Sequence, residues 1–206
     1  MAEYSTVLAE SVGEVEIKKS KFIARLAPVS DAAQARAFLD MVRDGNKRAR
    51  HNVHAFRLLD GVVGCSDDGE PQGTAGKPVL DALIGSGLYN VEIVVTRYFG
   101  GILLGTGGLV RAYSDAAKAS LVAASPVVMQ SANEYMLSVD YSRYGRVSAL
   151  IPEYGGKIDE TSFLNDIEIR FFIPDAQSEA FLSALSELTL GSVVPNLTGV
   201  TYRVKN

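Results

Sequence analysis

The sequence predicts an α+β protein of two domains: an N-terminal mixed sheet packed on helices, followed by a C-terminal domain of βαββαβ order. Strand-like and helix-like periodicities alternate along 206 residues that are 47% apolar, an ordinary globular composition. Pro126 follows the last residue of a long helical pattern and marks a boundary. The elements beyond it follow the split order of ferredoxin-like domains. We therefore expect the domains to span residues 1–128 and 129–206.

The first domain is expected to open with two strands, in GEVEIKKSKFIARLAPV at residues 13–29. Ser30 is then predicted to cap a helix that ends at Gly45. One face of this helix is apolar at Ala35, Phe38, Leu39 and Val42. The next two strands, NVHAFRLL and VVGCS, are joined by Asp60-Gly61, a strong hairpin signal.

Three further elements complete this domain. GKPVLDALIGSGL at residues 76–88 is typical of a short helix, and GGLVRAYSDAAKASLVAA at 107–124 of a longer one. Between them, VEIVVTRYF is apolar on both alternating faces from Val91 to Val95, which predicts an interior strand.

The second domain is predicted to begin with the strand EYMLSVDY and a helix that stops at Gly155-Gly156. The helix carries Val147, Leu150, Ile151 and Tyr154 on one face. Strands KIDETSF and DIEIRFFI meet at an Asn165 turn, Asp175 is expected to cap AQSEAFLSALSELTL, and VVPNLTGVTYRV closes the domain. It carries no catalytic constellation, so binding, positioning or a purely structural role remain open for it.

Composition excludes several classes of protein. The chain has no apolar run of the roughly 18 residues that span a bilayer and no basic-then-apolar leader, so we expect a cytoplasmic protein without membrane contact. A single cysteine, Cys65, excludes an internal disulfide and a zinc thiolate cluster. His51 and His54 are three apart and would point to opposite faces of a strand, which argues against a shared metal site and a Cys-His enzyme. We predict no cofactor and no metal.

Charge is unevenly distributed along a chain of net charge −4. Residues 18–57 hold ten Lys/Arg against three acids, whereas residues 128–206 hold six against ten. Lys47, Arg48 and Arg50 are therefore candidate nucleic-acid contacts, since clustered cations bind phosphate backbones. The alternatives are an acidic protein partner or plain solvated charges.

Glycines concentrate in the middle of the chain, with twelve of nineteen between Gly61 and Gly108. In YFGGILLGTGGLVRAY they follow a buried strand and lead into a helix, at Gly100, Gly101, Gly105, Gly107 and Gly108. Free N–H groups and the positive helix end could hold phosphate or sulfate at Gly105–Gly108. The spacing matches neither a P-loop nor a dinucleotide fingerprint, so tight turns that permit close packing are the alternative.

A second glycine-rich turn, DDGEPQGTAGKP, gathers the carboxylates of Asp67, Asp68 and Glu70. Such a cluster could bind magnesium or act as acid and base, although Asp and Gly are also ordinary turn residues. Arg97 interrupts an apolar run, so it either pairs with one of these carboxylates or faces a ligand. We expect a concave ligand-binding surface formed by the five glycines named above together with Asp68, Glu70, Thr74, Lys77, Arg97 and Arg111. No residue is assigned a catalytic role.

Three stretches, DDGEPQGTAGKPVLDAL, IVVTRYFGG and LGTGGLVRAY, resemble the signature of the Impact family and its bacterial YigZ-type members. KKSKFIARLAPV and HNVHAFRL are similar to blocks further upstream, so the match spans roughly residues 15 to 120. The C-terminal segment resembles the smaller second domain of bacterial members. Leu103 occupies a position where we expect many members to have lysine, so an anion contact made by a lysine side chain at this position is not expected here.

The resemblance implies a first domain like the second domain of a small-subunit ribosomal protein and a second domain like a late domain of elongation factor G. Eukaryotic relatives regulate translation by competing for the activator of a starvation-responsive kinase. For bacterial members the resemblance implies nucleic-acid or ribosome binding, and an old peptidase label exists. We therefore expect a translation-associated binding protein that contacts RNA, the ribosome or a translation-related protein. The alternative is a phosphate-handling or hydrolytic enzyme that uses the carboxylates of Asp67, Asp68 and Glu70 and the glycine-rich loop.

Overall fold

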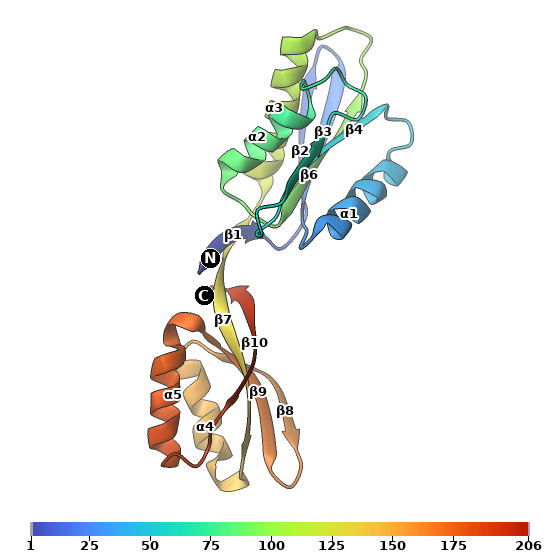
Figure 1. Cartoon of the computed structure of the whole chain (residues 1–206). Helices are drawn as coiled ribbons and strands as arrows, with labels where there is room; N and C mark the ends of the chain where they lie inside the picture. Colours follow the sequence, from blue (N-terminus) through green and yellow to red (C-terminus); the bar gives the residue numbers. More distant parts are fainter. Residues whose placement is uncertain (1, 206) are drawn as a thin grey trace. The chain divides into compact units, whose positions relative to one another are not determined.

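The computed structural model describes residues 2–205 and has an α+β fold with two sheets and five helices in these residues (Figure 1). The predicted fold class is thereby confirmed. The chain divides into two compact units: Tyr4–Val127 forms the N-terminal unit, and Val128 onward, together with Ala2 and Glu3, forms the C-terminal unit.

The N-terminal sheet has the strand order β2-β3-β6-β4-β5. Its strands are β2 (Ser11–Ile17), β3 (Ser20–Pro28), β4 (His51–Arg57), β5 (Val63–Ser66) and β6 (Val91–Tyr98). All four pairings are antiparallel, so the expected mixed sheet is wrong in this detail. The strands β3 and β4 do run in the same direction, but β6 lies between them and runs opposite to both.

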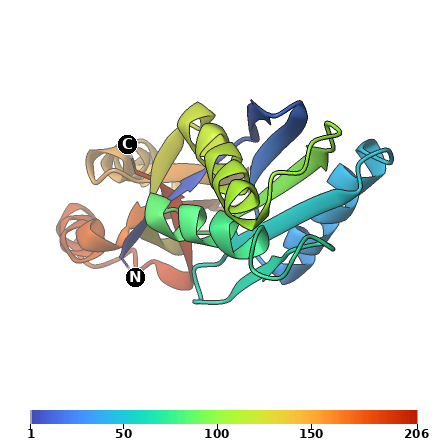
Figure 2. The same ribbon diagram turned by 90° about the horizontal axis from the view of Figure 1, so that it is seen from above.

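Helices cover both faces of this sheet. They are α1 (Ala32–Gly45), α2 (Gly76–Ser86) and α3 (Thr106–Ala123). Figure 2 shows α2 and α3 side by side over the sheet. Ile93 and Val95 of β6 pack in the cluster beneath α2 and α3, whereas Val94 packs with Leu39 and Val42 of α1 on the other face. The prediction that β6 is an interior strand is confirmed, because Ile93 and Val94 are fully buried.

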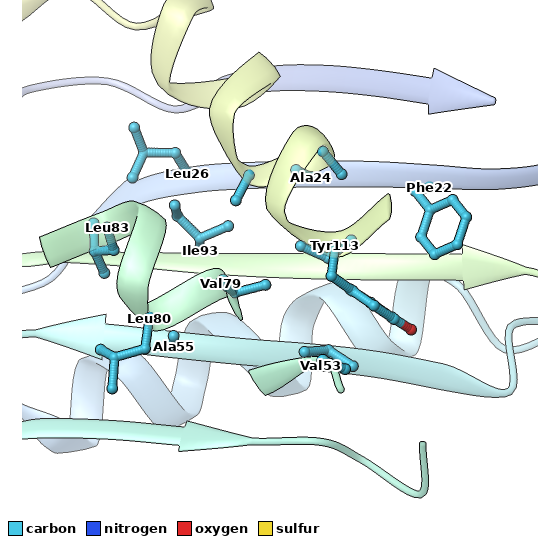
Figure 3. Close-up of a cluster of buried hydrophobic side chains, with 14 of the residues drawn as sticks. Phe22, Ala24, Leu26, Val53, Ala55, Val79, Leu80, Leu83, Ile93 and Tyr113 are labelled. Atoms are coloured by element: carbon cyan, nitrogen blue, oxygen red, sulfur yellow. The ribbon is translucent and has the colours of Figure 1, made fainter. Parts of the chain in front are cut away.

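The main core of the N-terminal unit lies between the sheet and the helices α2 and α3 (Figure 3). Phe22 of β3 meets Tyr113 of α3 edge to face, with ring centroids 5.1 Å apart. Both side chains are fully buried. Tyr113 thus fixes the position of α3 on the sheet through aromatic packing, while its hydroxyl remains available for a polar partner.

The C-terminal unit has the βαββαβ order that the sequence predicts. Its elements are β7 (Pro126–Val139), α4 (Tyr141–Glu153), β8 (Lys157–Phe163), β9 (Ile167–Pro174), α5 (Asp175–Thr189) and β10 (Asn196–Val204). Antiparallel pairing gives the strand sequence β10-β7-β9-β8, the ferredoxin-like arrangement. The strand β1 (Glu3–Val7) also pairs with β7. None of the helices between residues 2 and 205 is both long and apolar enough to cross a membrane.

Three local expectations need correction. The N-cap of α1 is Asp31, not Ser30: its carboxylate accepts the Gln34 N–H at 2.8 Å, and Ser30 donates to that carboxylate. The helix α5 begins at Asp175, whose carboxylate accepts from Asn133 instead of capping the helix. The first domain was expected to open with the strands of residues 13–29, whereas β1 precedes them; the pairing of β1 with β7 groups Ala2 and Glu3 with the second unit.

Candidate functional site

The loop between β5 and α2 holds the three clustered carboxylates, and each serves a different structural contact. The Asp67 carboxylate accepts backbone N–H groups of Gly73 at 2.8 Å, Ala75 at 3.1 Å and Gly76 at 2.8 Å. Partial burial works to raise the pKa of Asp67, but the three N–H donors outweigh it, so this pKa lies below its ordinary value. Asp67 therefore closes the loop and holds it on the first turn of α2.

Asp68 links this loop to α1 and β4. It has a left-handed backbone, with φ of 44°. Its carboxylate accepts from the Arg43 guanidinium at 2.6 Å and from the Asn52 N–H at 2.6 Å. His51 Nδ1 lies 2.8 Å from the Asp68 carbonyl oxygen. Since a carbonyl oxygen only accepts, Nδ1 carries a proton; in the neutral tautomer that has this proton, Nε2 is an acceptor.

Glu70 forms the buried centre of the site. One carboxylate oxygen accepts from the Arg97 guanidinium at 2.6 Å and from the Tyr113 hydroxyl at 2.7 Å. The Arg97 and Glu70 side chains are only 8% and 4% exposed. Burial first, and then the hydrogen bond and negative charge of Glu70, raise the pKa of Tyr113 far above its ordinary value. Arg97 therefore pairs with a carboxylate, one of the two roles that the sequence left open.

The structure thus separates the carboxylates instead of joining them around a common ligand. Thr74 donates its hydroxyl to the Pro71 carbonyl at 2.6 Å, and Lys77 pairs with Asp81 one turn further along α2. Arg111 is exposed on α3 and makes no ion pair within residues 2–205. In that same range, no three His, Cys, Asp or Glu side chains are grouped as a metal site would require.

We expect Asp67→Ala to cost about 1–3 kcal/mol of unfolding free energy, because it leaves three backbone donors without their acceptor. The pKa of Asp67 is lower in the folded than in the unfolded protein. Its contribution to folding stability is therefore fully present above the unfolded-state pKa and is lost as pH falls through the folded-state pKa. The wild type should therefore lose stability relative to Asp67→Ala in acid below the ordinary pKa of 3.8. Urea unfolding at a series of pH values checks this, and a constant difference between the two proteins would contradict it.

The glycines of the second loop have distinct roles. A Cβ on Gly100 would lie 2.0 Å from the Lys19 carbonyl carbon, so only glycine lets this loop contact the β2–β3 turn. Gly101 and Gly105 have φ of 85° and 70°. Gly105 is also the N-cap of α3, and as a glycine it has no side chain that could accept from the first N–H groups of the helix. Gly107 and Gly108 lie in the first turn of that helix, so the predicted phosphate or sulfate contact at Gly105–Gly108 stays a prediction.

Pairing neutralises part of the basic segment. Lys21, Arg25, Arg36 and Arg43 form ion pairs. Arg57 forms none with a described residue, but its guanidinium carbon lies over the Tyr89 ring, 3.7 Å from the centroid. The other five cations of residues 18–57 are exposed and make no ion pair with the described residues. We call them the free cations: Lys18, Lys19, Lys47, Arg48 and Arg50.

The free cations lie at one end of the N-terminal sheet. Lys18 and Lys19 form the β2–β3 turn beside Gly100, at the end of β6. The Tyr98 hydroxyl donates to the Asn46 side chain at 2.7 Å, which brings the segment with Lys47 and Arg48 to the same end. Arg50 directly precedes β4, where His51 pairs with Arg97 of β6. Figure 1 shows the β2–β3 turn and the loop after β6 together at this end of the N-terminal unit.

A pocket of about 240 Å³ opens at this end, and we call it the Phe99 pocket. It is lined by Arg50, His51, Arg97, Phe99 and Leu103. Phe99 is 52% exposed and Leu103 is 82% exposed, so apolar side chains lie open beside buried and exposed cations. A larger pocket of about 690 Å³ lies on the sheet of the C-terminal unit, where Arg203 pairs with Glu134 and Asp159.

Sequence reasoning missed several participants. Lys18, Lys19, His51 and Phe99 were not assigned to a site, although Lys18 and Lys19 stand in the basic segment and Phe99 in the recognised glycine stretch. Tyr113 lies in an ordinary helical pattern, and no sequence signal shows that its hydroxyl contacts Glu70, 43 residues away.

The family expectation is tested by comparison with known proteins. Residues 18–121 match the Impact N-terminal domain, and residues 137–192 match a domain of unknown function (DUF1949). The chain is 40% identical to an IMPACT family member of Haemophilus influenzae, over 96% of this chain and 98% of the relative. It is 39% identical to IMPACT family member YigZ of Escherichia coli, over 86% and 89%.

A solved structure described as a crystal structure of an hypothetical protein superposes with a TM-score of 0.69. It is 35% identical and covers 97% of this chain and 98% of its own. The chain therefore shares its sequence with the two curated relatives over most of its length, and its fold with the solved structure over 97% of the chain. This chain belongs to the Impact family.

Proposed function

We propose that the protein is a cytoplasmic, translation-associated binding protein that contacts RNA, free or on the ribosome, through the free cations of the N-terminal unit. The observation that carries the proposal is the gathering of these five unpaired cations at one end of the sheet. Unpaired cations on one surface are the usual means of binding a phosphate backbone. The relation of eukaryotic Impact proteins to translation supports a role in translation, and the unpaired cations support the choice of RNA.

The carboxylates support binding over hydrolysis. A general base needs a carboxylate oxygen within reach of a proton on substrate or water. Here Asp67 is occupied by three backbone N–H groups, Asp68 by Arg43 and Asn52, and Glu70 by Arg97 and Tyr113. These contacts hold in place the loops next to the cationic end, so the three carboxylates have a structural role.

Phosphate contacts predict a specific dependence on salt. We expect binding to single-stranded RNA to weaken steeply with salt, with log K falling by about 0.7 per neutralised phosphate for each tenfold rise in salt concentration. Lys47→Ala/Arg48→Ala/Arg50→Ala should reduce this slope by about 2, because it removes three cations. It should weaken binding similarly across sequences, since phosphate contacts carry no base information. Filter binding and ribosome co-sedimentation at several salt concentrations measure both effects.

The matched control removes three exposed cations from elsewhere: Lys118→Ala/Arg146→Ala/Lys157→Ala. This variant has the same net charge as the test variant, so it should keep nearly the wild-type slope if the contact is local. Equal losses in both variants would mean that only net charge attracts RNA. Absence of binding at low salt would reject the proposal.

A further inference from the structure

The Phe99 pocket combines features that the free cations alone do not explain. Cations suffice to hold phosphates, yet this pocket also presents an aromatic ring and an aliphatic side chain to solvent. Exposed large apolar side chains next to a cationic surface are typical of a binding site rather than of a solvated face. The chemistry of its walls indicates what would enter it.

The floor of the pocket is rigid. Arg97 is held through its guanidinium by Glu70, which is held in turn by the Tyr113 hydroxyl. The guanidinium carbon lies 5.5 Å from the centroid of the Phe22 ring and 5.7 Å from that of the Phe99 ring. Since Phe22 and Tyr113 are fully buried in the core, the packing and the Glu70 contact together hold Arg97 in position. Such preorganisation lowers the entropic cost of binding.

The polar groups offer both a donor and an acceptor. The buried Nε of Arg97 has no hydrogen-bond partner among residues 2–205. A buried donor without a partner is rare and calls for an explanation. Across the strand pair, His51 Nδ1 donates to the Asp68 carbonyl, and in the neutral tautomer with this proton Nε2 is an acceptor.

The size of the pocket limits the occupant. Pockets for drug-sized ligands measure about 300–1,000 Å³. At about 240 Å³ the Phe99 pocket is smaller and suits one planar ring system. Lys18, Lys19 and Arg50 lie at the same end of the sheet, where they can bind negatively charged groups attached to such a ring.

We propose that the Phe99 pocket binds one unstacked nucleobase of single-stranded RNA, stacked on the Phe99 ring, with its hydrogen-bonding edge toward Arg97 and His51. This inference rests on the proposed RNA binding and adds a base-reading element to it. Single-stranded RNA is commonly bound in this way, with bases stacked on aromatic rings and their edges hydrogen-bonded. The exposed cations then hold the flanking phosphates.

The test compares two probes and four proteins. The probes are a short oligoadenylate and the same ribose-phosphate backbone without bases. The proteins are the wild type, Phe99→Ala, Phe99→Tyr and the control Phe163→Ala, which removes an aromatic ring that is 58% exposed in the C-terminal unit. Fluorescence anisotropy gives the affinities, and the salt dependence of binding is measured for each combination of protein and probe.

We expect Phe99→Ala to weaken oligoadenylate binding about 5- to 150-fold, because stacking of one base contributes about 1–3 kcal/mol. Binding of the abasic backbone should change by no more than about twofold in the same variant, and the salt slope should not change. Phe99→Tyr keeps the ring and should bind like the wild type, as should Phe163→Ala.

Other outcomes separate the two proposals. If the wild type binds both probes with a salt-dependent affinity and Phe99→Ala affects both equally or neither, the pocket inference is wrong while RNA binding stands. If the wild type binds neither probe at low salt, the proposed function fails and the pocket inference falls with it. A Phe99-dependent complex with a ribosomal protein in the absence of RNA would also overturn the assignment of a nucleobase.

Discussion

Replacing Glu70 with glutamine is expected to destabilise the protein by about 3–5 kcal/mol, because it leaves the buried Arg97 guanidinium without its counter-charge. Glutamine keeps an oxygen that can accept from Arg97 and Tyr113, so the loss measures charge compensation more than hydrogen bonding. Urea unfolding followed by circular dichroism gives the change in free energy. A loss below about 1 kcal/mol would show that solvent reaches Arg97 and that the pair is not truly buried.

Two further variants make this test specific. Glu10→Gln breaks the exposed pair with Arg25 and should cost under about 1 kcal/mol. Glu70→Gln/Arg97→Met removes both charges and should recover much of the stability that Glu70→Gln loses, since a buried pair replaced as a whole is often nearly neutral. Failure of the double variant to recover stability would assign the effect to packing around Tyr113.

Replacing Phe22 with alanine is the second change with a large expected effect, about 3–5 kcal/mol. Phe22 is fully buried, meets Tyr113 edge to face and lies beneath the Arg97 guanidinium. Its removal would leave a cavity under the floor of the Phe99 pocket, so RNA affinity should fall together with stability. Hydrogen exchange of the β3 and β6 amides measures the local loss of protection.

The control for Phe22→Ala is Val12→Ala on the neighbouring strand β2, where the side chain is exposed. We expect this change to alter the free energy of unfolding by no more than about 0.5 kcal/mol. The amides of β9, and those of β7 from Val128 onward, belong to the other unit and provide a reference for exchange. Uniform acceleration across both sheets, or unchanged protection in β3 and β6, would contradict the placement of Phe22 in a core confined to the N-terminal unit.

Local sequence patterns predicted most of the elements, because strand and helix periodicities depend on neighbours a few residues apart. KIDETSF coincides with β8, and the helical face of Val147 and Ile151 is the buried face of α4. The residues that cap the helices were predicted less accurately. Ser30 and Asp31 are both good N-cap residues, and only the hydrogen bond from the Gln34 N–H shows which of them caps α1.

The candidate site was predicted only in part. The glycine loops and carboxylates were found from their composition, and the either-or choice for Arg97 was stated correctly. Its resolution required the fold, because Glu70 and Arg97 are 27 residues apart and meet only when β6 passes beneath the β5–α2 loop. The same holds for Arg43 and Asp68, which are 25 residues apart.

The sequence by itself determined the two-unit α+β class, the order of elements from β2 onward and membership of the Impact family, all of which follow from local periodicity and contiguous motifs; it did not indicate β1. Tertiary structure decided that β6 lies between β3 and β4, which cations are neutralised by partners, and which five remain free at one end of the sheet. The reason is physical: periodicity is encoded over a few residues, whereas charge compensation depends on distance in space. That distance is fixed only when the apolar faces of strands and helices pack together.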